Sequence, residues 1–509
     1  MAIIIRDSFD FYGTPSDGGA NFWDTFGTGS SLEKTITRMG QGQSLKLPGS
    51  NPASACSKSF TATGTVFCCF AMYPTTSSSD VRGAKFTFYD GTTVQAQVCF
   101  TDAGHIEVWQ GGNSDDFSGG TLLQKFLYAS SAHIWTHWQI KIVFDGTNGE
   151  VHIRKNGNPN DDYTVAGIST IKSANAQATR FALNYGKFGG TADRYFDDLA
   201  VWDATGTGPW TDWVGDIRAV VVMPSGDTTQ KDFAATPTSA QFGSNGTGNT
   251  FNPTAGWMEF CPVSASAGGV LGDSITMKMR SAMTGKVVVG LYDSDGPGGQ
   301  PGTLLAYAPE VTNPVAGDNA LTLNTTLTLK SGRTYWWGTL WSASSGSLEI
   351  DSGSSPIWYE YRPTYSSTLP ADVGSETLST FNARRACLHG TIATTNSGLL
   401  SELPTDDGTT FVSDDQVGDY DLYTTDGLPV TPHSILGVSV RGFAAKSDAG
   451  ARSGAIVLKS GSTEAASGDQ VLSTSWINLV MYQDTDPATG AAWTESGINA
   501  AQLGPKVTA

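Results

Sequence analysis

Short runs of alternating apolar and polar residues, separated by turn-forming dipeptides, constrain the fold of this chain more than any other feature. In QIKIVFDGTNGEVHIRK (139–155), two alternating runs flank Asp145-Gly146 and Asn148-Gly149. A period of two is typical of a strand that buries one face, and tight hairpin turns favour Asp-Gly and Asn-Gly. The stretch therefore predicts an antiparallel hairpin. Similar runs recur along the sequence, and helical periodicity is nearly absent.

The composition supports an all-β protein. Of the 509 residues, 60 are glycine, 10% are aromatic and only 15% are charged, against roughly 25% charged residues in an average soluble domain. Many short strands with Gly-rich turns, over a length that suggests several cores, favour three β-sandwich, jelly-roll-like domains. One exception is TESGINAAQLGPKV (494–507), which predicts one helical turn followed by a strand.

The charge balance argues against two classes of partner. The formal net charge is −18, whereas nucleic-acid binding needs a basic face that neutralises phosphates, and an anionic membrane would repel such a chain. No run approaches the roughly 18 apolar residues of a membrane-spanning helix. The N-terminal MAIIIRDSFDFYG (1–13) lacks the apolar core of a signal peptide. We therefore expect no nucleic-acid or membrane partner, and synthesis in a cytoplasm.

The paired carboxylates of RYFDDLAVWD (194–203) are the first candidates for catalysis. On a strand, Asp197 and Asp198 would point to opposite faces, whereas glycoside cleavage needs two carboxyls about 5–10 Å apart across one cleft. The E-x-D-x-x-E strand of jelly-roll glucanases does not occur, because EIDSGS (349–354) begins like it but ends in Ser354. No Ser/His/Asp set can be assembled either. The sequence therefore predicts no enzyme, and a structural hydrogen-bonding role for the two aspartates at a sheet edge.

Metal binding has weak support in the sequence. The six cysteines show no CxxC spacing and no Cys/His cluster, which argues against zinc. Buried free thiols are their expected state, with a disulfide as the alternative if the protein matures outside the cell. Calcium prefers about six to eight oxygen ligands, and YDSDGPGG (292–299) offers Asp293 and Asp295 as the first candidates. Turn-forming aspartates are far commoner than metal ligands. We therefore expect no cofactor, with calcium at these two residues as the alternative.

Aromatic residues in strand-like runs are the candidate contacts for a glycan or a protein partner. Their rings can pack on the apolar faces of sugars, although half-buried strands also use Trp and Tyr for internal packing. In TYWWGTLW (334–341), Trp336 and Trp337 would face opposite sides of a strand, so that at least one of them would be exposed or in an interface. The nominated contacts are Trp135, Trp138, Trp337, Trp341, Trp358 and Tyr361.

Two groups of sequence stretches carry a resemblance to a known family. The first group is IIIRDSFDFYG (3–13), GQGQSLKLP (40–48), WTHWQIKIVFDGTNGEVHIRKNG (135–157) and RYFDDLAVWDATG (194–206). These stretches resemble the concanavalin A/laminin-G-like jelly-roll domains of bacteriophage structural proteins. The second group is similar to the C-terminal half of phage virion proteins and comprises WVGDIRAVVVMPSGDTTQKDF (213–233), DDGTTFVSDDQVGDYDLYTTDGLP (406–429) and DPATGAAWTESGINAAQLGPKV (486–507).

The resemblance also implies an organisation into domains. In such virion proteins the pieces that correspond to 213–233 and 406–429 run almost continuously, so the residues between them indicate an insertion. The implied domains are a concanavalin A/laminin-G-like sandwich (1–214), a C-terminal sandwich (215–235 plus 400–509) and an inserted, adhesin-like sandwich (236–399).

The implied function is that of a non-enzymatic structural protein of a tailed-phage particle. It would decorate the capsid or form part of a neck or tail appendage, and it would be made in the host bacterial cytoplasm. Its expected partners are other virion proteins, further copies of the chain in a homo-oligomer with a trimer as the first guess, and a host surface glycan. The alternative is a lectin whose main activity is receptor recognition.

Overall fold

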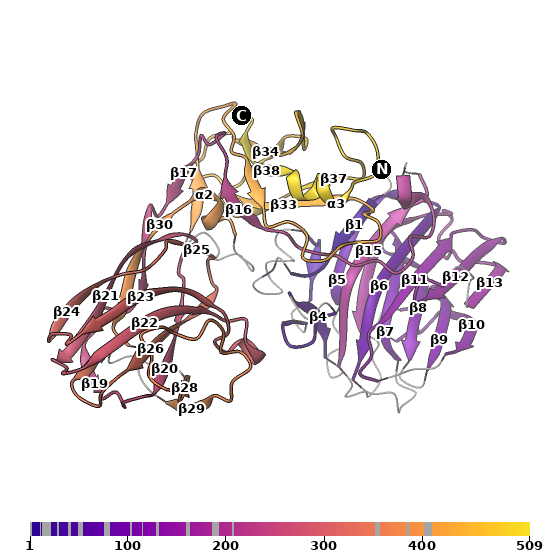
Figure 1. The fold of residues 1–509 in the computed structure, drawn as a ribbon. Helices are drawn as coiled ribbons and strands as arrows, with labels where there is room; N and C mark the ends of the chain where they lie inside the picture. Colours follow the sequence, from indigo (N-terminus) through magenta and orange to yellow (C-terminus); the bar gives the residue numbers. More distant parts are fainter. Residues whose placement is uncertain are drawn as a thin grey trace. The chain divides into compact units, whose positions relative to one another are not determined.

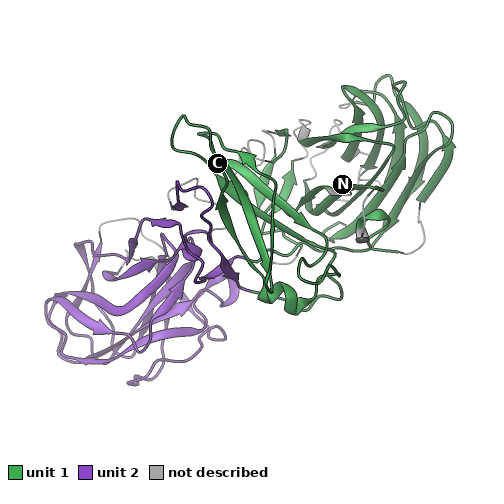
Figure 2. Cartoon of the chain, turned by 90° about the horizontal axis from the view of Figure 1, so that it is seen from above, with its two compact units in different colours: residues 1–222, 403–405, 427–509 green, residues 223–402, 406–426 purple. Residues whose placement is uncertain are grey.

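The structure is a computed structural model, and the predicted all-β class is confirmed. It describes residues 3–10, 12, 22–27, 30–38, 42–48, 54–75, 82–101, 104–113, 116–128, 132–158, 163–185, 193–205, 208–351, 357–382, 386–401 and 410–509. The described elements are antiparallel strands with a few short helical turns (Figure 1). The chain divides into two compact units (Figure 2): unit 1 contains residues 1–222, 403–405 and 427–509, and unit 2 contains residues 223–402 and 406–426.

The N-terminal part of unit 1 is a sandwich of two antiparallel sheets. Sheet A has the strand order β13 (Tyr163–Ile168), β12 (Gly149–Lys155), β11 (Thr136–Val143), β6 (Thr65–Pro74), β15 (Arg194–Asp203), β4 (Ser44–Leu47) and β3 (Ser31–Glu33), with β1 (Ile3–Asp7) paired to β15. Sheet B has the order β10 (Thr121–Leu127), β9 (His105–Gln110), β8 (Thr93–Thr101), β7 (Arg82–Asp90), β14 (Ala178–Tyr185), β5 (Ser54–Thr63) and β2 (Thr25–Phe26).

Sequence alternation places the core of this sandwich between the sheets. The predicted hairpin is confirmed as β11 and β12, whose Ile140 and Ile153 are paired. Phe70 of sheet A stacks on Phe86 of sheet B at 4.0 Å between ring centroids, and Trp138 is buried beside them. Full burial of such a side chain contributes about 1.5–3 kcal/mol, so these aromatic residues fix the two sheets face to face.

The alternation of side chains between the two faces of the sheet is interrupted in the middle of β15. Asp197 is paired with Ala71 of β6, but Ala200 is paired with Cys69, so one extra residue lies on β15. Asp198 at this bulge has a left-handed backbone with φ 53°. Because side chains alternate along a strand, the extra residue turns the positions after it onto the other face. The bulge therefore places Trp202 on the outer face of sheet A, the face that Tyr195 also occupies.

The C-terminal part of unit 1 packs on the sandwich. Its elements are β33 (Val438–Ala444) paired with β37 (Ile477–Gln483), β34 (Ser453–Ser460) paired with β35 (Thr463–Ala466), β36 (Gln470–Val471) and β38 (Gln502–Val507), and α3 (Glu495–Ala500); η1 (Gly208–Thr211) follows β15. Phe443 and Val480 contact the sandwich core. Thr494 Oγ1 accepts a hydrogen bond from Gly497 N (3.0 Å) and caps α3. The helical turn and strand predicted over 494–507 are thus confirmed.

Unit 2 is a second sandwich. One sheet has the order β18 (Ser239–Gly243), β30 (Leu388–Thr394), β21 (Gly269–Ser281), β27 (Ser347–Asp351) and β19 (Gly248–Phe251), with β24 (Gly317–Thr322) and β25 (Leu327–Leu329) on β21. The other has β23 (Leu304–Thr312), β22 (Lys286–Asp293), β26 (Thr334–Trp341), β20 (Met258–Ser264), β28 (Ile357–Tyr361) and β29 (Ser379–Asn382). Smaller elements are β16 (Pro224–Asp227) paired with β32 (Tyr423–Thr425), β17 (Ala234–Thr236) paired with β31 (Phe411–Ser413), η2 (Pro297–Gly299) and α2 (Asn396–Leu399).

A buried carboxylate ties together the two ends of unit 2. Asp421 Oδ1 accepts hydrogen bonds from the backbone of Asp232 (2.7 Å) and Phe233 (2.9 Å), and its Oδ2 accepts one from Asn396 Nδ2 (2.7 Å). The segment that enters the unit and the segments that leave it therefore meet at one residue. Unit 2 includes residues on both sides of 236–399, and the predicted domain bounds stay a prediction. None of its described helices, or those of unit 1, is long and apolar enough to span a membrane.

Candidate functional site

The outer face of sheet A, which points away from sheet B, carries two aromatic clusters. We call Tyr73, His133, Trp135 and Tyr195 the open cluster, and Phe67, Trp202, Trp210 and Trp213 the covered cluster. Strands β6 and β15 contribute to both, since Tyr73 is paired with Tyr195 and Phe67 with Trp202. The bulge of β15 makes this arrangement, because uninterrupted alternation from Tyr195 onward would turn Trp202 toward the core.

Tyr73 is the centre of the open cluster. Its ring centroid lies 5.5 Å from that of Trp135 and 5.9 Å from those of both His133 and Tyr195. The Tyr73 hydroxyl and His133 Nδ1 are 3.3 Å apart, within hydrogen-bond distance. His133 is exposed, Tyr73 and Trp135 are half-buried, and the neighbouring Ile134 is 55% exposed. The cluster thus presents ring surface and polar groups to solvent.

Local contacts hold the open cluster in place. His133 has a left-handed backbone with φ 61°, and its N–H donates to Pro74 O at the end of β6 (2.8 Å). At the rim, Lys46 Nζ lies 2.7 Å from Asp193 Oδ2 and 5.8 Å from the ring centroid of Tyr195. The hydrogen bond to Asp193 raises the pKa of Lys46, so its ammonium group stays charged at neutral pH.

This set of groups matches the chemistry of sugar recognition. Aromatic faces pack on the apolar C–H faces of a pyranose ring while hydroxyl and imidazole groups exchange hydrogen bonds with sugar hydroxyls. Tyr73, His133 and Trp135 supply both kinds of contact within one cluster. Trp135, which the sequence nominated as a contact, therefore lies in a surface suited to that role.

The covered cluster has a different environment. Phe67 stacks on Trp202 at 5.3 Å with nearly parallel rings, and Trp210 meets Trp202 edge-on at 5.2 Å. Trp210 Nε1 donates to Leu436 O (3.1 Å), and Trp202 Nε1 donates to Asp212 O (3.2 Å). The chain after β15 and the C-terminal part of unit 1 therefore bury this cluster, and it holds unit 1 together.

Asp197 and Asp198 lie between the two clusters, and both engage Arg38. Asp197 Oδ2 accepts a hydrogen bond from Arg38 N (3.2 Å), and Asp198 Oδ2 pairs with Arg38 Nη1 (2.7 Å). Ala219 N donates to Asp198 Oδ1 (2.7 Å). The expected structural role is thus seen, with two corrections: the bulge lets both carboxylates reach one residue, and β15 lies inside sheet A, between β6 and β4, rather than at an edge.

Burial changes the acidity of this region. It raises the pKa of Asp197 to about 8, helped by the nearby charges of Asp198 and Asp10. Burial also raises the pKa of Asp10 to about 7, against the hydrogen bond that its Oδ1 accepts from Gln43 N (2.6 Å). Both carboxyls therefore bind a proton in the folded state at pH values where they would be ionised in the unfolded chain.

Four of the nominated aromatic contacts are corrected by their positions. Trp138 is in the core of the N-terminal sandwich, and Trp337, Trp341 and Trp358 are in the core of unit 2. The expectation that Trp336 or Trp337 is exposed is also wrong, since both are buried. Each lies on a strand with another layer packed on its side chain, so its ring is closed to a ligand. Tyr361 is half-buried and keeps some ring surface exposed.

The calcium candidates take part in local bonds. Asp293 accepts hydrogen bonds from Arg333 Nε (3.0 Å) and Nη2 (2.8 Å), and Asp295 accepts them from Thr303 N (2.7 Å) and Oγ1 (2.6 Å). Among the described residues, no three His, Cys, Asp or Glu side chains are grouped as a metal would require. The six cysteines are buried.

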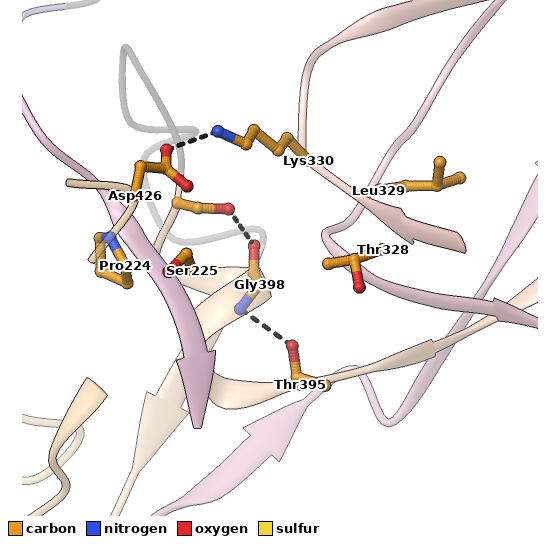
Figure 3. Close-up of a pocket in the computed structure, with 9 residues that line it drawn as sticks. Pro224, Ser225, Thr328, Leu329, Lys330, Thr395, Gly398 and Asp426 are labelled. Carbon is orange, nitrogen blue, oxygen red and sulfur yellow. Dashed lines mark hydrogen bonds and ion pairs between the residues drawn. The ribbon is translucent and has the colours of Figure 1, made fainter. Parts of the chain in front are cut away.

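A pocket of about 260 Å³ lies within unit 2 (Figure 3). Lys330 Nζ and Asp426 Oδ2 form an ion pair at 2.5 Å on one side of it. On the other, Ser401 Oγ donates to Gly398 O (2.9 Å), and Gly398 N donates to Thr395 Oγ1 (3.0 Å). These five lining residues thus bond to one another, and we assign the pocket no ligand.

The outer face of sheet B is the site that sequence reasoning missed. Asn184 of β14, Lys85 of β7, Cys99 of β8 and Glu107 of β9 lie side by side across four strands. A parallel row contains Thr87, Gln97 and Trp109. We call these seven residues the polar face.

Sequence alternation marks the polar face as solvent-facing, yet most of it is buried. Lys85, Thr87 and Gln97 have no exposed surface. Gln97 Nε2 donates to Gly111 O (2.8 Å), and Trp109 Nε1 donates to Glu107 Oε2 (3.1 Å). The only available signal was the mixture of a lysine, a glutamate and amides at alternate positions, and that mixture does not distinguish a covered face from a solvated one.

The comparisons with known proteins concern the fold. No family model and no curated protein matches the chain. Among solved structures, the catalytic domain of a glycoside hydrolase family 131 protein from Coprinopsis cinerea is 14% identical, with 40% of this chain and 96% of that chain covered and a TM-score of 0.27. The PL-14 alginate lyase from Aplysia kurodai is 11% identical (34% and 86% covered, TM-score 0.26). Arcelin-5, a lectin-like defense protein from Phaseolus vulgaris, is 10% identical (39% and 97% covered, TM-score 0.21).

These matches correct one prediction. The sequence was interpreted as that of a protein without enzymatic activity because an E-x-D-x-x-E strand is lacking. That inference was wrong, since a glycoside hydrolase and an alginate lyase are among the structures similar to this one. The concanavalin A-like, lectin-like part of the family resemblance agrees with these matches at the level of fold. The bacteriophage part stays a prediction.

Proposed function

We propose that this chain is a carbohydrate-binding protein and that the open cluster is its sugar-contact surface. The observation that carries the proposal is the half-exposed pair Tyr73 and Trp135, whose ring centroids are 5.5 Å apart with the exposed His133 beside them. Exposed apolar surface bordered by polar groups is typical of ligand-binding sites. The covered cluster on the same face is the internal contrast, because there the chain itself buries the rings.

Glycan binding by the full-length chain tests this proposal. Glycans retained on a glycan array would be titrated by calorimetry and by tryptophan fluorescence. We expect Trp135→Ala to weaken binding at least about tenfold, which is about 1.4 kcal/mol. Trp257→Ala is the matched control, because Trp257 is a half-buried tryptophan of unit 2 under the Arg362 guanidinium (5.5 Å). Equal binding by the wild type and Trp135→Ala would refute the assignment of the open cluster.

The biological setting is proposed from the sequence resemblance alone. We propose that the chain is a component of a tailed-phage particle, in capsid decoration or in a neck or tail appendage. There it would assemble with further copies of itself, first as a trimer, and with other virion proteins, and it would present the open cluster to a host surface glycan. Mass spectrometry of separated heads and tails tests this: a stoichiometric signal in one fraction supports it, and absence from both fractions contradicts it.

A further inference from the structure

The open cluster is one end of a row of side chains that crosses four strands of sheet A. On the outer face, Tyr73 of β6 is paired with Tyr195 of β15. Tyr195 is paired with Lys46 of β4, and Lys46 with Ser31 of β3. Because neighbouring strands lie about 4.8 Å apart, the row extends over about 14 Å. A surface of this length can contact several successive units of a linear oligosaccharide.

The charged groups at the far end of this row are an ion pair and a separate carboxylate. Lys46 Nζ is paired with Asp193 Oδ2 (2.7 Å), so this cation already has a counter-charge. Glu33 of β3 forms no ion pair with any described residue; its Oε1 accepts hydrogen bonds from Thr35 N (3.0 Å) and Thr35 Oγ1 (2.7 Å). These bonds lower the pKa of Glu33. An ionised carboxylate without a cationic partner therefore lies at the β3 end.

Glu33 is on the same face of sheet A as the aromatic rings. Its neighbour Leu32 packs against the sandwich core, so alternation places Glu33 on the outer face. Glu33 is diagonal to Lys46 across the β3–β4 pair and is two strand spacings, about 10 Å, from β15. Burial raises the pKa of Tyr195, Lys46 lowers it, and Asp193 and Glu33 raise it further. The charge of Glu33 is therefore felt at the edge of the open cluster.

The rings at the other end of the row suit a positive charge as well as a sugar ring. The rings of Trp135, His133 and Tyr195 are inclined to that of Tyr73 by 49°, 74° and 81°. An ammonium group within about 6 Å of an aromatic centroid is attracted to the ring face, as Lys46 Nζ is at Tyr195 (5.8 Å). Among the described residues, no cation lies over Tyr73 or Trp135. These two rings can therefore accept an ammonium group from a ligand.

We infer that the ligand of the open cluster is a linear oligosaccharide of amino sugars that crosses the strands from β6 to β3, an inference that rests on the proposed function. Its sugar rings and their ammonium groups would contact Tyr73 and Trp135, and an ammonium group about three units further along would pair with Glu33 Oε2. An acidic oligosaccharide would be repelled by Glu33, since Lys46 is already paired with Asp193. A neutral one would leave Glu33 without a partner.

Calorimetry of the full-length protein at about pH 6, where sugar amines are protonated, tests this inference. The cationic probe is fully deacetylated chitohexaose (hexaglucosamine), and chitohexaose itself is the neutral probe. We expect the wild type to bind hexaglucosamine at least about tenfold more tightly. Glu33→Gln should weaken hexaglucosamine binding at least about threefold, as expected for a partly exposed ion pair, and should leave chitohexaose binding unchanged. Asp469→Asn is the matched control, because it removes one negative charge at an exposed position before β36.

The outcomes separate this inference from the proposed function. If Glu33→Gln weakens hexaglucosamine binding no more than Asp469→Asn does, the attraction is a general effect of net charge and the inference is overturned. Equal affinity of the wild type for the two hexamers also overturns it, but the proposed function stands if Trp135→Ala then weakens both. Hexaglucosamine binding that Trp135→Ala leaves unchanged would mean that the ligand binds elsewhere, and would overturn the open cluster as a sugar site together with this inference.

Discussion

The open and covered clusters share one sheet face and two strands but have opposite environments. Tyr73 and Tyr195 pack with Trp135 in a cluster that is partly exposed to solvent. Phe67 and Trp202, in contrast, are covered by Trp210 and the C-terminal part of unit 1. The side chains are of the same kind, and the strands are the same. The difference teaches that an aromatic residue on a sheet becomes a binding surface or a packing surface according to what the rest of the chain lays over it.

The largest effect is expected from inserting one alanine between Ala200 and Val201, beyond the bulge. The insertion would shift the phase of the strand after it, so that Trp202 would turn toward the core and Val201 toward the outer face. We expect loss of cooperative folding of unit 1, a change above about 4 kcal/mol, measured by near-UV circular dichroism and urea denaturation. Asp198→Asn is the control, since asparagine tolerates the left-handed backbone and should preserve the fold. An insertion variant with native stability would show that the phase of β15 is not needed for the covered cluster.

Trp202→Ala should come next. It removes a fully buried ring that stacks on Phe67 and meets Trp210 edge-on, and such truncations cost about 3–5 kcal/mol. Urea denaturation of the full-length protein, followed by the transition of unit 1, measures the loss. Glycan affinity at the open cluster should be unchanged in the fraction that remains folded. A loss below about 1 kcal/mol would mean that the covered cluster contributes little to unit 1.

Stability should also depend on pH through the acids between the clusters. The folded-state pKa values of Asp197 and Asp10 are raised to about 8 and about 7 from 3.8, so in this window the folded state binds more protons than the unfolded state. The stability of unit 1 should therefore fall as pH rises from about 4 to about 8, by up to about 1.4 kcal/mol per pH unit for each carboxyl. Urea denaturation at pH 5 and pH 8 measures it. Asp197→Asn should flatten the dependence, and an unchanged slope in this variant would assign the effect to other groups.

The smallest effect on stability is expected from Trp135→Ala. Its ring is half-buried and lies at the rim of the sheet, so truncation should change the free energy of unfolding by less than about 1 kcal/mol. Thermal and urea denaturation measure this change in the same samples used for glycan binding. A destabilisation as large as that of Trp202→Ala would mean that the open cluster is a packing element, and the contrast between the clusters would disappear.

Local patterns in the sequence were enough for much of the fold. The hairpin of β11 and β12 follows from alternation around Asp145-Gly146 and Asn148-Gly149, and the turn and strand at 494–507 follow from a capping threonine and an apolar pattern. Both depend on residues within about twenty positions of one another. The all-β class followed for the same reason, because short strands and turns are encoded locally.

The sites could be predicted only in part, because they depend on coverage by distant segments. From the sequence alone, Trp135 and Trp138 were both nominated as contacts for a ligand. In the structure, Trp138 faces the other sheet and Trp135 faces solvent. Leu436, which helps to bury Trp210, lies 226 positions away in the chain. The bulge at Asp198 could not be predicted either. Nothing in the apolar run around Asp198 marks it as a residue with a left-handed backbone. The polar face was missed because Lys85 and Gln97 have the sequence pattern of solvated positions.

The contact between Arg441 and the first strand has a consequence for synthesis on the ribosome. Arg441 Nη1 lies 3.2 Å from the Tyr12 hydroxyl and 3.6 Å from Asp7 Oδ1, and that hydroxyl donates to Asp7 Oδ2 (2.8 Å). Arg441 is translated 429 positions after Tyr12, and only after all of unit 2. The nascent N-terminal sandwich therefore lacks the cation beside Asp7 until unit 2 has been translated. A chain that stops before Arg441 would lack this contact, so unit 1 reaches its full stability only after that residue has been added.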